Sequence, residues 1–135
     1  MRYDWQYAIS LLGHVDFWSA SWLVVKLSLM AWIVSAVLGF GLALAKQSRQ
    51  PIIRSLAQTY IWSFRSLPLL ILLIFIYSVP QVVPAARAVL SNSFIAGLIA
   101  LVLSETAYMA EIHRGGLLSI HKGQIEAGRA LGIKF

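Results

Sequence analysis

The stretch Leu27–Ala45, LSLMAWIVSAVLGFGLALA, holds nineteen uncharged residues in a row between Lys26 and Lys46. As an α-helix it would be about 28 Å long, close to the thickness of the hydrocarbon core of a bilayer. The stretch therefore predicts a first membrane-spanning helix over residues 22–45.

Two further apolar segments follow and predict spans over residues 62–80 and 94–113. The polar and basic residues 46–65 between the first two spans predict a short cytoplasmic loop that then enters the bilayer. With 59% hydrophobic and 12% charged residues, the chain has too few polar side chains to cover a soluble globule. We expect an all-α, polytopic membrane helix bundle with about three transmembrane helices.

A stripe of small residues runs along the first predicted span. Ser35, Gly39 and Ala43 follow one another at i+4 spacing, so they share one face of a helix. Such a stripe lets a second helix approach closely in a membrane, although chance spacing in a Gly/Ala-rich span is the alternative.

The net charge of +6 fits a membrane protein better than a nucleic-acid-binding protein, because the basic residues are interleaved with apolar runs. Two segments hold eight of the eleven basic residues, and cytoplasmic segments of membrane proteins are enriched in such residues. The two segments contribute Lys46, Arg49, Arg54, Arg65, Arg114, Lys122, Arg129 and Lys134. Arg2, Lys26 and Arg87 fall on the opposite side, which predicts an N-terminus outside the cell. A removable signal peptide is not evident, and the absence of cysteine excludes disulfides and thiolate metal sites.

Two motifs resemble the permease family of polar amino-acid ABC importers, which serves histidine, glutamine, glutamate, arginine and opines. The first, YIWSFRSLPLLILLIFIY at residues 60–77, is similar to the family's aromatic-Phe-Arg-Gly-Thr-Pro-Leu-Leu element, with Ser66 and Leu67 in place of Gly and Thr. The second, AYMAEIHRGGLLSIHKGQIEAGRALG at residues 107–132, resembles the exit of the third span and the cytoplasmic Glu-Ala-Ala-x-x-x-Gly loop. Here Gly128 replaces the second Ala, and Gly132 follows Glu126 at the expected spacing.

The second motif predicts a cytoplasmic coupling loop over residues 119–135. A short rigid helix with a small-residue surface and polar ends is suited to carry force to a soluble ATPase. Gly132 is suited to end that helix in the left-handed conformation. An ordinary amphipathic surface helix is the alternative. The residues predicted to couple to the ATPase are Gly123, Gln124, Glu126, Ala127, Gly128, Arg129 and Gly132.

The resemblance implies a non-enzymatic permease subunit in the bacterial inner membrane. The implied partners are an ABC ATPase subunit, a second permease subunit, a soluble substrate-binding protein and membrane lipid, with no nucleic acid. It also implies a core of five spans, so residues 1–135 would be the N-terminal part of a longer transmembrane domain. No cofactor is expected on this chain, because Gly123-x-x-x-x-Gly128-Arg129-Ala130 lacks the Lys and Ser/Thr of a phosphate-binding loop. ATP and Mg²⁺ would be used by the partner ATPase.

Glu105 falls near the middle of the third predicted span, where a carboxylate is costly unless it faces a partner or a polar cavity. Tyr108 lies one helical turn away, so the two side chains are candidates to line a translocation path for a cationic amino acid. The equal alternative is that Glu105 pairs with Arg or Ser of a neighbouring helix and holds the bundle together. A protonated, purely structural Glu105 is a third interpretation.

Four other residues are candidates for structural or gating roles. Glu111 and Arg114 are i,i+3 neighbours and predict a local ion pair, with gating as the alternative. Arg65, shortly before Pro68, is expected to anchor the cytoplasmic end of the second span through lipid phosphates or helix carbonyls. No metal site is predicted, because the histidines have no ligand cluster around them.

Two other functional classes compete with the permease. The first is a small membrane assembly protein that uses its helices only for packing. The second is an intramembrane hydrolase using Glu105 and His113. Those two residues are about 12 Å apart along one helix, so they cannot form a direct dyad.

Overall fold

Helices make up the regular structure of the computed structural model, which describes residues 5–132. In chain order they are α1 (Trp5–Leu11), α2 (Val15–Lys46), α3 (Pro51–Ser66), α4 (Leu69–Val82), the 3-10 turn η1 (Pro84–Ala86), α5 (Arg87–Leu90), α6 (Ser93–Leu118) and α7 (Lys122–Ala130). The described residues contain no strand, so the predicted all-α class is confirmed. Arg2 and Lys134, which entered the prediction of orientation, lie outside the described residues, as does the end of the predicted coupling loop.

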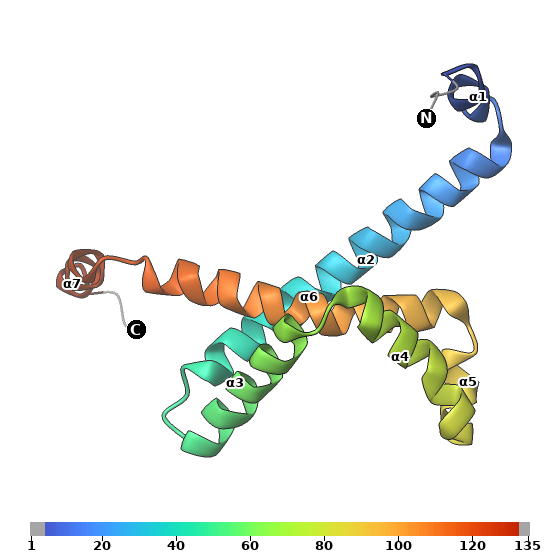
Figure 1. Ribbon diagram of the computed structural model, residues 1–135. Coiled ribbons are helices and arrows are strands. Elements are labelled where there is room, and N and C mark those ends of the chain that lie inside the picture. The colour runs from blue at the N-terminus through green and yellow to red at the C-terminus, as the bar shows by residue number, and fades with distance from the viewer. Residues whose placement is uncertain (1–4, 133–135) are drawn as a thin grey trace.

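The two longest helices, α2 and α6, are each long and apolar enough to cross a membrane. They contain 32 and 26 residues, which corresponds to lengths of about 48 Å and 39 Å. The predicted spans 22–45 and 94–113 lie inside them, and α2 begins earlier than predicted, at Val15. Figure 1 shows α2 and α6 crossing, with α1 at the free end of α2 and α7 beyond the end of α6.

The loop predicted over residues 46–65 is wrong, because most of it is helix α3. Pro51 stands in the first turn, where a missing N–H costs nothing, and Ala57 and Ile61 lie one turn apart and are buried. Arg54 and Arg65, two of the basic residues of this segment, lie on the exposed part of an amphipathic helix.

The predicted second span, residues 62–80, is not one straight helix. It crosses a break at Leu67 and Pro68, where α3 and α4 meet at a bend of 104°. Leu67 is extended, with φ −86° and ψ 127°, the conformation that a following proline favours and that a helix cannot continue through. Figure 1 shows the two arms diverging from this break, α3 towards its connection with α2 and α4 towards α5.

Both arms of the broken span are fixed to α6 by tyrosine hydroxyls. Tyr60 of α3 donates to the carbonyl oxygen of Leu103 at 2.9 Å, and Tyr77 of α4 donates to that of Ser93 at 2.8 Å. A small apolar core lies between α4 and α6, made of Leu72, Ile76, Ala96 and Ala100. The bend is therefore held at several points along α6.

The small-residue stripe predicted on α2 is confirmed. Ser35, Gly39 and Ala43 are buried where α2 packs on α6. A Cβ placed on Gly39 would lie 2.6 Å from Cβ of Met109 and 3.0 Å from the backbone nitrogen of Ala110. Backbone contact this close requires glycine, so the spacing is a packing device and not chance.

An asparagine caps the start of α6. Asn92 precedes the helix with an extended backbone, and its Oδ1 accepts hydrogen bonds from the backbone N–H groups of Phe94 and Ile95, at 2.9 and 3.3 Å. This N-cap satisfies donors that would otherwise be unpaired at the helix start.

Candidate coupling and translocation site

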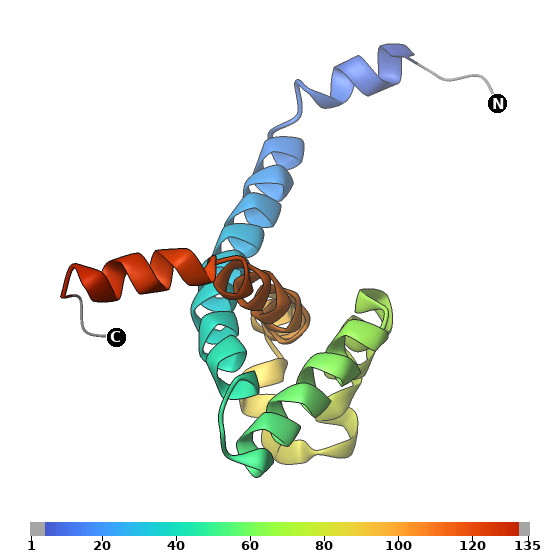
Figure 2. The same cartoon turned by 90° about the vertical axis from the view of Figure 1, so that its left-hand side faces the viewer.

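Helix α7, the predicted coupling element, stands apart from the bundle. It follows α6 after the short link 119–121 and makes no extensive contact with another helix in the described part of the chain (Figures 1 and 2). Ser119 ends α6 compactly, since its hydroxyl donates to the carbonyl of Gly116 at 2.7 Å. Because α7 makes no extensive contact within residues 5–132, most of its surface is open to a partner.

The predicted coupling residues lie on or beside α7. Six of them are exposed, namely Gly123, Gln124, Glu126, Ala127, Arg129 and Gly132. Gly128 is buried and so does not belong to the exposed surface. Gly132 has φ +79°, the left-handed conformation predicted for the residue that ends this helix.

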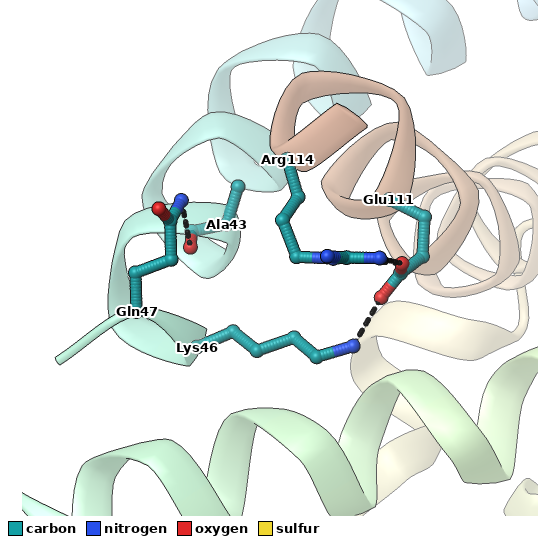
Figure 3. A network of polar contacts seen from close by, with 5 residues as sticks. All are labelled: Ala43, Lys46, Gln47, Glu111 and Arg114. Carbon is teal, nitrogen blue, oxygen red and sulfur yellow. Dashed lines mark hydrogen bonds and ion pairs between the residues drawn. The ribbon is translucent and has the colours of Figure 1, made fainter. Parts of the chain in front are cut away.

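Glu111 is the centre of a polar cluster where α2 ends against α6. One carboxylate oxygen pairs with Nζ of Lys46, and the other accepts from Nε and NH2 of Arg114 at 3.0 and 2.8 Å (Figure 3). The Glu111–Arg114 pair is the one predicted from the i,i+3 spacing. Sequence reasoning missed Lys46, which is 65 positions from Glu111 and lies on another helix.

A second contact joins the same part of α6 to α2. His113 lies with Nε2 3.0 Å from the carbonyl oxygen of Ala36, and because a carbonyl only accepts, Nε2 carries the proton. The ring of Phe40 stands edge-on to His113, with centroids 5.6 Å apart. The His113 side chain thus contacts α2 through a hydrogen bond and a ring contact, which agrees with the geometric argument against a dyad with Glu105.

Glu105 faces a groove between α6 and the first half of α2. The groove encloses about 370 Å³ and is lined by Ser28, Leu29, Ala31, Trp32, Leu101 and Glu105. Within residues 5–132, no side chain forms an ion pair or hydrogen bond with Glu105. The carboxylate is therefore available to a group from outside this part of the chain.

Tyr108 and Arg65 come together at the break between α3 and α4. The guanidinium carbon of Arg65 lies 5.5 Å from the centroid of the Tyr108 ring, within the range of a cation–π contact. The structure thus gives Arg65 an aromatic partner on α6, which the sequence analysis did not foresee. Pro68, a few residues on, begins the second arm, so Arg65 and Tyr108 mark the point where the span changes direction.

Comparison with known proteins places these features in a family. Residues 35–135 match the family model described as binding-protein-dependent transport system inner membrane component. The chain is 34% identical to the arginine transport system permease protein ArgU of Corynebacterium glutamicum, over 98% of this chain and 45% of that protein. It is 39% identical to the octopine transport system permease protein OccM of Rhizobium meliloti, over 96% of this chain and 52% of that protein.

A solved structure agrees with the sequence relatives. The fold superposes on a chain from the crystal structure of an amino acid ABC transporter with histidines, with a TM-score of 0.73 and 30% identity over 99% of this chain and 60% of that one. The chain spans about half the length of the curated relatives it matches. It belongs to the family of binding-protein-dependent transport system inner membrane components, whose amino-acid permeases it resembles along almost its whole length.

Proposed function

We propose that this chain forms part of the membrane-spanning permease subunit of an ATP-driven amino-acid importer, with α7 docking on a separate ATPase subunit. The observation that carries the proposal is the isolation of α7. It is a helix of nine residues that exposes both signs of charge and makes no extensive contact with the described bundle. Rigid exposed helices of this kind fit a groove on a partner protein.

A force applied to α7 would reach the bundle through α6. Beyond the short link, α6 is joined to α2 by the Glu111 cluster, by His113 and by close packing at Gly39. It is joined to α3 by Tyr60 and Tyr108. A movement of α6 would therefore be transmitted to α2 and α3, as alternating access requires.

The cargo site is the second part of the proposal. Glu105 lines a groove and has no partner in the described residues, which supports contact with a cationic group of the cargo. The relatives named for arginine and octopine favour the same chemistry, because both compounds carry a guanidinium group. The pairing of Glu105 with a residue outside the described chain is the competing role.

The arrangement of charged residues supports a cytoplasmic location for α7 and an external N-terminus. Lys46 and Arg114 meet at Glu111, so the two basic segments lie at one end of the bundle. Lys26 lies near the other end, with Nζ 5.8 Å from the centroid of the Phe94 ring at the start of α6. A second permease subunit, a soluble binding protein and membrane lipid are the remaining proposed partners.

The coupling role is tested by Glu126→Lys in the complete permease, assembled with its ATPase and binding protein in proteoliposomes. We expect ATP-driven uptake to be lost while membrane insertion is unchanged, because the reversed charge would oppose docking. The matched control is Asp16→Lys, which reverses an exposed charge in the first turn of α2, at the opposite end of that helix from the Glu111 cluster. Normal uptake in the Glu126 variant would refute the docking role of α7.

The cargo role is tested by Glu105→Gln in the same system. If the carboxylate meets the cargo, uptake of cationic amino acids should fall more than uptake of neutral ones. A uniform loss that follows the amount of folded protein would instead assign Glu105 to bundle stability.

A further inference from the structure

The N-terminal arm, residues 5–25, extends beyond the helix bundle. Lys26 lies against Phe94 near the start of α6, so the residues of α2 before Lys26 continue past the end of its main packing partner. Helix α1 then turns away from α2, and Figures 1 and 2 show it apart from the other helices. It makes no extensive contact with any other described element.

The surface of this arm is strongly apolar. Trp5, Ile9 and Leu12 follow i, i+4, i+7 spacing and are 69%, 65% and 54% exposed, so they form one stripe along α1 and its exit. Trp18 and Trp22 of α2 are 59% and 68% exposed. Gln6 lies on a different side of α1 and is also exposed. Helix α1 is therefore amphipathic, with an exposed apolar stripe on one side.

The elbow, the turn at residues 12–14 between α1 and α2, is held by specific contacts. The indole N–H of Trp18 donates to the carbonyl oxygen of Leu12 at 2.8 Å, across the turn. Backbone bonds from Gly13 to Ser10 and from His14 to Leu11, at 3.0 and 3.1 Å, close the turn itself. The Phe17 ring stands edge-on to Trp18 at 5.7 Å. The direction in which α1 leaves α2 is thus fixed by specific contacts.

The length of α2 indicates what surrounds the arm. A helix of about 48 Å exceeds a hydrocarbon core of about 30 Å, and transmembrane helices accommodate such mismatch by tilting up to about 40°. At that tilt α2 would span about 37 Å along the bilayer normal, so its first turns would reach the headgroup layer. Tryptophan is enriched at that depth, and Trp18 and Trp22 lie in these turns.

We propose that α1 is a membrane-surface anchor, whose stripe of Trp5, Ile9 and Leu12 inserts into the headgroup–acyl boundary of the phospholipid bilayer beside α2. Helix α1 directly precedes the candidate membrane span α2, and it contains no charged residue from Trp5 to Leu11. The elbow would transmit the orientation of α1 to α2 and hold its tilt. A soluble protein partner is the competing occupant, and the test separates the two.

Residues 1–135 contain no cysteine, so single spin labels can be introduced here once any cysteine in the rest of the complete permease is replaced. Ile9→Cys and Gln6→Cys place labels on different sides of α1, in the complete permease reconstituted in phosphatidylcholine–phosphatidylglycerol vesicles without other proteins. Ile33→Cys, on the exposed side of α2, supplies the lipid reference, and Glu126→Cys on α7 supplies the water reference. The measurement is the rate at which each spin label collides with oxygen, which concentrates in lipid, divided by its rate of collision with a water-soluble nickel chelate.

We expect a several-fold higher ratio of oxygen to nickel collisions at Ile9 than at Gln6, with Ile9 close to the lipid reference. Equal, water-like ratios at both positions would overturn the proposal, as would protection of Ile9 that arises only when the soluble binding protein is added. Trp18→Phe removes the indole N–H. If the difference between the Ile9 and Gln6 labels is lost in this variant, the membrane contact of α1 depends on the elbow. The result does not depend on ATP or uptake, so it can fail while the proposed transport function stands.

Discussion

Gly39 is the residue on which the contact between α2 and α6 depends most directly. In Gly39→Ala the new methyl group would meet Cβ of Met109 and backbone atoms of α6, which cannot move as a flexible side chain would. We expect the free energy of unfolding to fall by about 1–3 kcal/mol, the usual cost of overpacking a tight contact. The measurement is unfolding of the purified protein in mixed micelles by titration with SDS.

Gly41→Ala provides the control on the same helix. Nothing lies within 4 Å of a Cβ built on Gly41, so the substitution causes no clash. Its remaining effect is to restrict the backbone of the unfolded chain. It should leave stability unchanged or raise it by about 0.5–1 kcal/mol. Equal destabilisation by the two substitutions would show that Gly39 is not a point of close approach.

Lys46 and Glu111 should be coupled in stability. Their side chains are 23% and 17% exposed, so the pair is more shielded from solvent than a surface ion pair, and Arg114 shares the carboxylate. In a double-mutant cycle with Lys46→Met and Glu111→Gln we expect a coupling of about 0.5–3 kcal/mol. Arg49→Met, at an exposed arginine that forms no ion pair among the described residues, should change little. Additive effects in the cycle would mean that the contact does not tie α2 to α6.

Among single residues, the sequence predicted features that follow from helical spacing and missed the pairs of side chains that meet across helices. The Glu111–Arg114 pair and the Ser35–Gly39–Ala43 stripe follow from helical spacing alone. Lys46 with Glu111 and Arg65 with Tyr108 depend on how helices cross, and one sequence does not encode that in any local pattern.

Among the elements, the break between α3 and α4 departs most from the prediction. Apolar composition predicted a span, but the direction change requires the extended backbone at Leu67, which Pro68 favours. The amphipathic pattern of α3 was present in the sequence. Its two exposed arginines, Arg54 and Arg65, make the same residues resemble a polar, basic loop.

Pro68→Ala should loosen this break without removing it. The substitution allows Leu67 to become helical, while Tyr60 and Tyr77 still hold the two arms on α6. Spin labels at Leu56 and Ile74, which are exposed on α3 and α4, report the angle as a distance distribution. We expect a broader distribution that extends to longer distances in Pro68→Ala.

Pro51→Ala is the control for that measurement. Pro51 lies at the first position of α3, where other residues are also tolerated, so the distribution should stay as in the unsubstituted protein. An unchanged distribution in Pro68→Ala as well would assign the bend to the α6 contacts alone.

For the whole molecule, the arrangement of charge predicts which ends face the cytoplasm. Lys46 and Arg114 meet at Glu111, near the end of α6 from which α7 projects, whereas Val15 and α1 lie at the opposite end of α2 (Figure 1). Because basic residues concentrate on the cytoplasmic side, α7 should be inside and Val15 outside. The orientation decides the transport proposal, since a helix outside the cell cannot reach an ATPase that uses cytoplasmic ATP.

Cysteine labelling in intact cells tests this orientation on the full-length permease. A membrane-impermeant maleimide should react with Val15→Cys, an 81% exposed position, before the cells are opened. Glu126→Cys should react only after permeabilisation, because α7 would be shielded from the reagent by the membrane and not by its own bundle. If Glu126→Cys is labelled from outside, the charge argument is wrong and α7 cannot serve as the coupling helix, whatever its fold.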